Sequence, residues 1–142
     1  MGKTPEELRA IDAMVEERIM GRKPILFGHS YRSAGTWLSY PPDNLEAEGV
    51  IVPNYTTDIA AAWSVRAAME AKGFESEDRL TWMGWGGKHD HPYGYSIWFK
   101  VWPDRHEPDA GCDRSYHHHV KDHKDAPLAI CLAALSALGA KA

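Results

Sequence analysis

Histidine is the first residue type in this chain whose number and spacing could do chemistry. Seven of the eight histidines lie between residues 89 and 123, and imidazole is a common zinc ligand. A helical turn there would place His119 and His123, four residues apart, on one face. The same holds for His118 and Asp122. No HExxH or CxxC spacing accompanies them, so the segment is either a metal site or a solvated, pH-sensitive loop. The candidate metal ligands are His117, His119 and His123.

Aromatic side chains form a second cluster between Trp82 and Trp102, with lysines interleaved at positions 88 and 100. Aromatic faces beside cations stack nucleobases and hold phosphates. The cluster is also typical of a buried core or a subunit interface, because tryptophan burial strongly stabilises a fold. Trp98 is the interface candidate under that alternative. The predicted ligand-binding residues are Trp85, Lys88, Tyr93 and Arg105.

A glycine-rich segment at residues 84–88 joins two predicted strands. Phosphate-binding glycine loops join a strand to a helix instead, so we interpret this segment as a hairpin connection with a bulge. Close approach of its backbone to a ligand is the alternative. No serine has the sequence context of a nucleophile elbow. The acidic residues of the first predicted helix, which include Asp12 and Glu16, are expected on its solvated face. The sequence therefore favours binding over catalysis and leaves an enzyme as the less favoured alternative.

Composition limits the class of protein further. The chain has 142 residues, with 44% hydrophobic and 25% charged residues, so we expect a single domain over residues 1–142 with a packed core. A net charge of −4 argues against a DNA-binding or membrane-surface protein. Two cysteines cannot build a disulfide scaffold. The charged N-terminus is unlike a signal peptide, and the apolar run at 126–138 is too short to span a bilayer. We expect a cytosolic protein.

Three helices are predicted from capping residues and apolar spacing. Thr4 and Pro5 begin the first helix, and Gly21 ends it. Thr56 is the favoured N-cap of the second helix, which ends at Gly73 and is apolar around much of its circumference, Ile59 and Trp63 included. The last helix follows the N-cap candidate Asp125 and ends at Gly139.

Two strands are predicted between the second and third helices, at residues 80–85 and 95–102. The second strand has large apolar residues on both faces, so we expect helices on each side of a small, mostly antiparallel sheet. Residues 22–53 are interpreted as an irregular insertion with short strand-like runs. Residues 103–125 are interpreted as a polar, His-rich loop. The expected fold class is α/β, a small α-β-α sandwich with three main helices.

Three segments of this sequence resemble the phage ABA sandwich domain family, small proteins of phage and prophage genomes. They are VEERIMG at 15–21, YTTDIAAAW at 55–63 and APLAICLAAL at 126–135. The resemblance implies an α-β-α sandwich fold and a phage origin, and it carries no established biochemical activity. The sequence departs from the family at residues 22–53 and in the His-rich insert before Ala126. A function private to this protein is expected there.

From these observations we expect a phage-encoded, non-catalytic binding protein in the cytoplasm of the host bacterium. Its ligand would be a small anionic molecule, such as a nucleotide that signals in bacterial immunity, and a homo-oligomer is compatible with this function. One alternative is a metal-dependent hydrolase that uses the region from His89 to His123. Another is a structural or host-partner-binding protein with a Trp-rich interface. Neither DNA nor a membrane is an expected partner, and zinc is the one cofactor considered.

Overall fold

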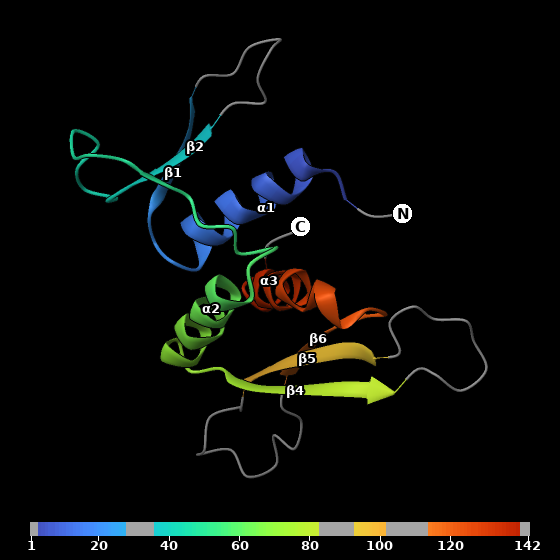
Figure 1. The fold of residues 1–142 in the computed structure, drawn as a ribbon. Helices are drawn as coiled ribbons and strands as arrows, with labels where there is room; N and C mark the ends of the chain where they lie inside the picture. Colours follow the sequence, from blue (N-terminus) through green and yellow to red (C-terminus); the bar gives the residue numbers. More distant parts are fainter. Residues whose placement is uncertain (1–2, 28–35, 83–92, 102–113, 140–142) are drawn as a thin grey trace, which may run out of the picture.

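In the computed structural model, residues 3–27, 36–82, 93–101 and 114–139 are described, and they form three helices and six strands (Figure 1). In chain order the elements are α1 (Pro5–Arg18), β1 (Lys23–Phe27), β2 (Thr36–Tyr40), β3 (Val50–Ile51), α2 (Ile59–Ala71), β4 (Glu75–Trp82), β5 (Tyr93–Val101), β6 (Arg114–Val120), a short 3-10 turn η1 (His123–Asp125) and α3 (Ala126–Ala137). None of the helices in this part of the chain has the length and apolar character needed to cross a membrane.

Helix α1 begins and ends at the residues that the sequence predicts. Thr4 Oγ1 accepts a hydrogen bond from the backbone N–H of Glu7 at 3.2 Å, and Pro5 lies in the first turn, where a missing N–H does no harm. Gly21 follows the helix with a φ of +75°, a conformation that favours glycine. Local signals therefore suffice to define this element.

Helix α2 is capped by Asp58, so the preference for Thr56 was wrong. Asp58 Oδ1 accepts a hydrogen bond from Ala60 N at 2.9 Å. Thr56 is buried instead, and its backbone N–H donates to Asp12 Oδ1 of α1 at 2.8 Å. A tertiary contact thus holds Thr56 outside the helix. Gly73, with a φ of +99°, follows the C-cap residue as predicted.

The strands form two separate antiparallel sheets, in the orders β1-β2-β3 and β4-β5-β6. The predicted mixed α/β class with three helices is confirmed, whereas the single sheet is replaced by two. The segment expected to be irregular supplies all of the first sheet. Strand β6 lies inside the segment expected to be a loop. The sequence did not reveal this strand, because its histidines hide the alternation of Tyr116, His118 and Val120, which share one face.

Strand β4 begins at Glu75, five residues before the predicted start. Its first half is polar on both faces, so it gives no strand signal in the sequence. The structure shows why polar residues are tolerated there: Arg66 of α2 donates to Ser76 Oγ at 2.6 Å and pairs with Asp78 at 3.1 Å. These contacts satisfy the polar side chains on the face toward the helices.

All three helices lie on the same side of the β4-β5-β6 sheet (Figure 1). Helix α3 is central, because it contacts α1, α2, β5 and β6. Of the described elements, none covers the opposite face of this sheet, so the expectation of helices on both faces was wrong for this part of the chain. The α-β-α layering is not confirmed. The side chains with 0% exposure that join this sheet to the helices include Ile97, Phe99, Val65, Met69, Ala129, Ile130, Ala134 and Leu135.

Two residues of α2 that were expected in the core are exposed. Ile59 and Trp63 each have 43% relative exposure, and the guanidinium of Arg66 lies 5.0 Å from the Trp63 ring centroid. The buried residues of α2 are Ala62, Val65 and Met69, which form one stripe. The helix is therefore buried on one side, in contrast to the wide buried surface that its apolar sequence predicts.

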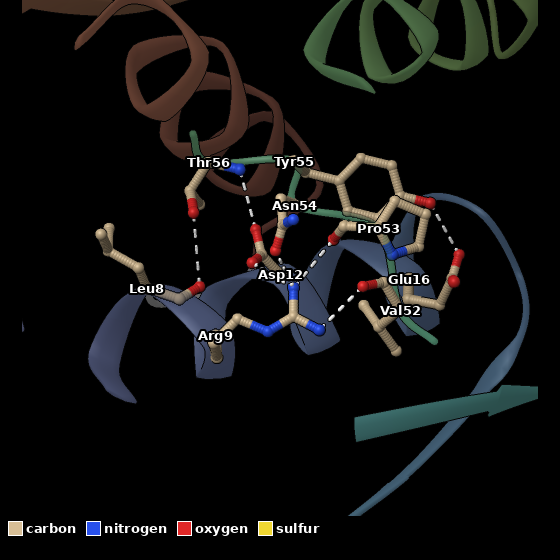
Figure 2. A network of polar contacts seen from close by, with 9 residues as sticks. All are labelled: Leu8, Arg9, Asp12, Glu16, Val52, Pro53, Asn54, Tyr55 and Thr56. Carbon is tan, nitrogen blue, oxygen red and sulfur yellow. Dashed lines mark hydrogen bonds and ion pairs between the residues drawn. The ribbon is translucent and has the colours of Figure 1, made fainter. Parts of the chain in front are cut away.

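A network of polar contacts joins α1 to the segment before α2 (Figure 2). Arg9 Nη1 donates to Asp12 Oδ2 at 2.8 Å, to Asn54 Oδ1 at 2.8 Å and to the carbonyl of Pro53 at 3.2 Å. Its Nη2 donates to the carbonyl of Val52 at 2.7 Å. One guanidinium thus holds a carboxylate on its own helix and three acceptors more than 40 residues away in sequence.

The two acidic residues of this network, Asp12 and Glu16, are 1% and 2% exposed, so their predicted place on a solvated face was wrong. Burial raises the pKa of Asp12, and hydrogen bonds from Thr56 and Arg9 oppose that rise. Glu16 Oε1 accepts a hydrogen bond from the Tyr55 hydroxyl at 2.8 Å. Burial, followed by this hydrogen bond, raises the pKa of Tyr55. Hydrogen-bond partners of Asp12 and Glu16 come from residues 55 and 56. The periodicity of the helix sequence cannot reveal contacts with such a distant segment.

Candidate functional site

The face of the β4-β5-β6 sheet that points away from the helices gathers polar, charged and aromatic side chains. We call it the outer face. Strand alternation and the pairing register assign its residues, which are Glu75, Glu77, Arg79, Ser96, Trp98, Lys100, Ser115, His117 and His119. An antiparallel sheet with one solvated face normally carries polar residues there. A half-buried tryptophan flanked by an arginine and a histidine departs from that pattern, and makes this face the candidate site.

Trp98, on the central strand, is flanked by a planar group from each neighbouring strand. The His117 ring of β6 stacks on it with 4.6 Å between ring centroids and 17° between ring planes. The Arg79 guanidinium of β4 lies 5.8 Å from the Trp98 ring, within the range of a cation–π interaction. Three planar side chains from three strands therefore support one another on this face.

Beside this stack, Arg79, Ser96 and His119 form one row across the three strands. Ser96 is only 6% exposed, and its Oγ lies 2.7 Å from His119 Nδ1. Arg79 and His119 are exposed on either side of it. In the tautomer with its hydrogen on Nε2, the imidazole accepts the Ser96 hydroxyl hydrogen at Nδ1, and Nε2–H is left to donate to another acceptor. The row therefore offers a guanidinium and an imidazole to an anion.

The remaining charges of the outer face lie in the adjacent rows. Lys100 Nζ donates to Glu77 Oε2 at 2.7 Å, and this hydrogen bond, followed by the positive charge of Lys100, lowers the pKa of Glu77. That lysine charge is thus largely offset by its carboxylate partner. Within the described residues, Arg79 has no carboxylate at ion-pair distance. Arg79 is therefore the cation of this face best placed to bind an anion.

The metal hypothesis depends on a helical turn that does not form. Residues 117–119 belong to β6, so His117 and His119 share the outer face while His118 points to the helices. His123 lies beyond the strand in η1, with its Nδ1 3.8 Å from Asp122 Oδ1. In the described ranges no three His, Cys, Asp or Glu side chains are arranged to hold a metal ion.

Of the four predicted ligand-binding residues, the structure describes only the backbone position of Tyr93. Trp85, Lys88 and Arg105 lie outside the described residues. Tyr93 is the first residue of β5, paired with Trp82 of β4 at the hairpin end of the sheet. The structure instead brings together Trp98, His117 and His119, which were named in the sequence, with Arg79 and Ser96, which were not. Ser96 shares a face with Trp98 by alternation within the predicted strand at 95–102. Placing Arg79 on that face requires the register of β4 against β5, which the polar start of β4 hides.

The buried titratable groups near α1 do not form a second site. Cys131 has 0% exposure, and burial raises the pKa of its thiol, which disfavours the reactive thiolate. Asp12 and Glu16 have the partners described above. Among the described residues, no buried side-chain nitrogen or oxygen lacks a hydrogen-bond partner. This cluster therefore stabilises the fold.

His118 makes a testable contribution to stability on the inner face of the sheet. Burial, followed by the charges of His117, His119 and Lys3, lowers its pKa. The unfolded chain then binds a proton more readily than the folded one, so stability falls as the pH drops through the pKa of unfolded histidine, about 6.5. We expect a His118→Gln variant to lose less thermal stability than the natural sequence between pH 8 and pH 5.

Thermal unfolding at a series of pH values checks this expectation. Near pH 8 the histidine is neutral in the unfolded chain as well. The melting temperatures of the two proteins should therefore change equally little with pH there, which serves as the control. The same fall in melting temperature for both proteins between pH 8 and pH 5 would show that His118 does not contribute.

These features define a class of structure: a mixed α/β protein with a helical layer, two antiparallel sheets and a polar, aromatic sheet face. No family model and no curated protein matches the chain. Among solved structures, it is similar to a phage protein from Bacillus cereus ATCC 14579, known from a 2.0 Å crystal structure. The TM-score is 0.52 at 16% sequence identity, over 100% of this chain and 94% of that chain. This similarity shows a shared fold, and membership of the ABA sandwich family stays a prediction.

Proposed function

We propose that this protein is a non-catalytic binding protein that holds a small anionic ligand with a planar group, such as a nucleotide, on the outer face of the β4-β5-β6 sheet. The observation that carries the proposal is the row of Arg79, Ser96 and His119 beside the stack of Trp98 and His117. The row supplies the charge for an anion, and the stack supplies aromatic surface for a planar group.

The spacing of the row suits a phosphate or carboxylate group. Neighbouring strands lie about 4.8 Å apart, so Arg79 and His119 lie on either side of an anion placed over Ser96. Ser96 is the smallest of the three side chains and is held by His119. An anion there would meet longer donors on both sides, which is the arrangement that charge-assisted hydrogen bonds require.

The surroundings of the Ser96–His119 pair favour binding over catalysis. Its 2.7 Å separation is that of a nucleophile and its base. However, β5 is the central strand and pairs with both neighbours, so its backbone N–H groups are committed to the sheet. They are therefore unable to stabilise an oxyanion over Ser96. The pair is better suited to orient the imidazole toward a bound anion.

A phage origin agrees with this function. The fold is shared with a phage protein, and the sequence resembles a family of small phage proteins. A phage protein that binds a nucleotide in the host cytoplasm would lower the concentration of that nucleotide for host proteins. We therefore include a cyclic dinucleotide, a type of signal molecule, among the probes below.

Calorimetric titration of the full chain with AMP, ATP, a cyclic dinucleotide and inorganic phosphate tests the proposal. We expect at least one nucleotide to bind more tightly than phosphate. Arg79→Gln should weaken that binding about tenfold or more, because it removes a charge-assisted hydrogen bond. Native mass spectrometry of protein purified from phage-infected cells should show the bound mass.

The matched control is Lys72→Gln, which removes an exposed cation at the end of α2, outside the outer face. It should bind like the natural sequence. Failure of every probe to bind, or equal affinities of the Arg79→Gln and Lys72→Gln variants, would overturn the proposal. So would capture of a host protein, in place of a small molecule, through Trp98.

A further inference from the structure

The β1-β2-β3 sheet carries an apolar face that no described element covers. Register and alternation place on one face the side chains of Ile25, Phe27, Leu38, Tyr40 and Ile51. Phe27 is 44% and Ile51 67% exposed, and the Phe27 and Tyr40 rings are in contact, with 6.2 Å between centroids. We call this set the apolar face.

The opposite face of the same sheet is the one that packs on the body of the protein. Ser39 and Val52 on that side have 0% exposure, Trp37 packs against the core, and Arg22 Nε donates to Ser39 Oγ at 2.7 Å. Leu26 and Val50 lie on this side too, in the two outer strands, and are 37% and 54% exposed, so the sheet packs on the core through its central strand β2. Its solvent side should then be polar, yet only Lys23 and Thr36, at the ends of the strands, are polar there. Contiguous exposed apolar surface of this kind is typical of an interaction site.

We propose that the apolar face binds the same face of a second copy of this chain, related by a two-fold axis parallel to β2. Rotation about that axis places β1 of one copy over β3 of the other. The register puts Lys23 in one row with Tyr40, and Gly49 continues this row because it lies against the Tyr40 ring. Lys23 of one copy therefore meets the start of β3 in the other copy.

Charge complementarity favours a second copy of this chain as the partner of the apolar face. The connection from β2 to β3 carries three exposed acidic residues, Asp43, Glu46 and Glu48. Glu46 and Glu48 are nearest to the start of β3, so the proposed axis brings each Lys23 toward the acidic turn of the other copy. Among the described residues of one chain, the ion pair of Lys23 is a loose one with Glu17, at 3.8 Å and with both side chains about half exposed. An apolar centre with opposite charges at one end is self-complementary, as a two-fold interface requires.

The β1 edge of the sheet also favours the face-to-face mode. β1 is an edge strand and contains Pro24, which lacks the N–H that a further strand would need. Proline on an edge strand disfavours addition of another strand. The available apolar surface therefore lies on the face, and the proposal is independent of ligand binding at the other sheet.

Analytical ultracentrifugation of the full chain over a range of concentrations tests the proposal. We expect a monomer–dimer equilibrium. Ile51→Asp and Phe27→Asp should each raise the dimer dissociation constant about tenfold or more, with circular dichroism confirming that both variants fold. Leu80→Asp, which alters a 60% exposed apolar residue of the other sheet, should leave the equilibrium unchanged.

Charge reversal tests the direction of the axis. Lys23→Glu alone should weaken the dimer, and combining it with Glu46→Lys and Glu48→Lys should restore it. A chain that is monomeric at all concentrations would overturn the proposal, as would a dimer that tolerates both Ile51→Asp and Phe27→Asp. A dimer that is lost in Ile51→Asp but indifferent to charge reversal would overturn the two-fold arrangement.

Discussion

Replacing Asp12 with alanine is expected to lower the free energy of unfolding by about 3 kcal/mol. The substitution leaves the buried N–H of Thr56 without its acceptor and removes the carboxylate that pairs with Arg9 at 2.8 Å. Arg9 would keep its bonds to the carbonyls of Val52 and Pro53, so the guanidinium is not left wholly unpaired. Chemical denaturation of the variant and the natural sequence measures the difference.

Glu17→Ala is the matched control for this prediction. Glu17 lies on the same helix but is about half exposed, and its ion pair with Lys23 is long. Surface ion pairs of this kind contribute little, so we expect a change within about 0.5 kcal/mol. If Asp12→Ala were as mild as Glu17→Ala, the polar network would not join α1 to residues 52–56 as we infer.

Replacing Phe99 with alanine is expected to have a comparable or larger effect, a loss of about 3 to 5 kcal/mol. Phe99 has 0% exposure, lies on the central strand of its sheet and faces the helical layer. Removal of its ring leaves a cavity between α3 and the sheet, which packed elements close only in part. For a chain of this length the melting temperature should fall by about 10 °C.

Phe99→Leu tests how much of the loss comes from the cavity, because leucine keeps an apolar side chain and fills part of the space that the ring leaves. We expect it to restore roughly half of the lost stability. Leu80→Ala, at a 60% exposed position on β4, should change little. A loss below about 1 kcal/mol for Phe99→Ala would contradict the assignment of this residue to a tightly packed core.

The candidate site could be predicted only in part from the sequence. Trp98, His117 and His119 stand out by residue type, and each of them lies on the outer face. Their partners Arg79 and Ser96 do not stand out, because an arginine in a polar run and a single serine are common. Which of them meet depends on the register across three strands, and a shift of one residue would move each side chain to the other face.

The histidine segment shows how one residue period can be mistaken for another. Spacings of four residues predicted a shared helix face for His119 and His123, whereas His119 lies in the extended strand β6 and His123 in the short turn η1. Pairing with β5 decides this, because strand β6 pairs with β5 along its whole length and partly buries alternate residues on the side of α3. Contacts with a strand about 20 residues earlier cannot be found in the local pattern.

The sequence by itself determined the three helices. Thr4 with Pro5, Gly73 and Gly139 define helix ends through contacts or backbone conformations within a few residues, so local chemistry specifies them. Only the tertiary structure decided that Asp12 and Glu16 are buried and that Arg79 lies beside Trp98. Each of these depends on a partner far away in sequence or on a neighbouring strand. The energy of a buried charge or a stacked ring is set by those partners.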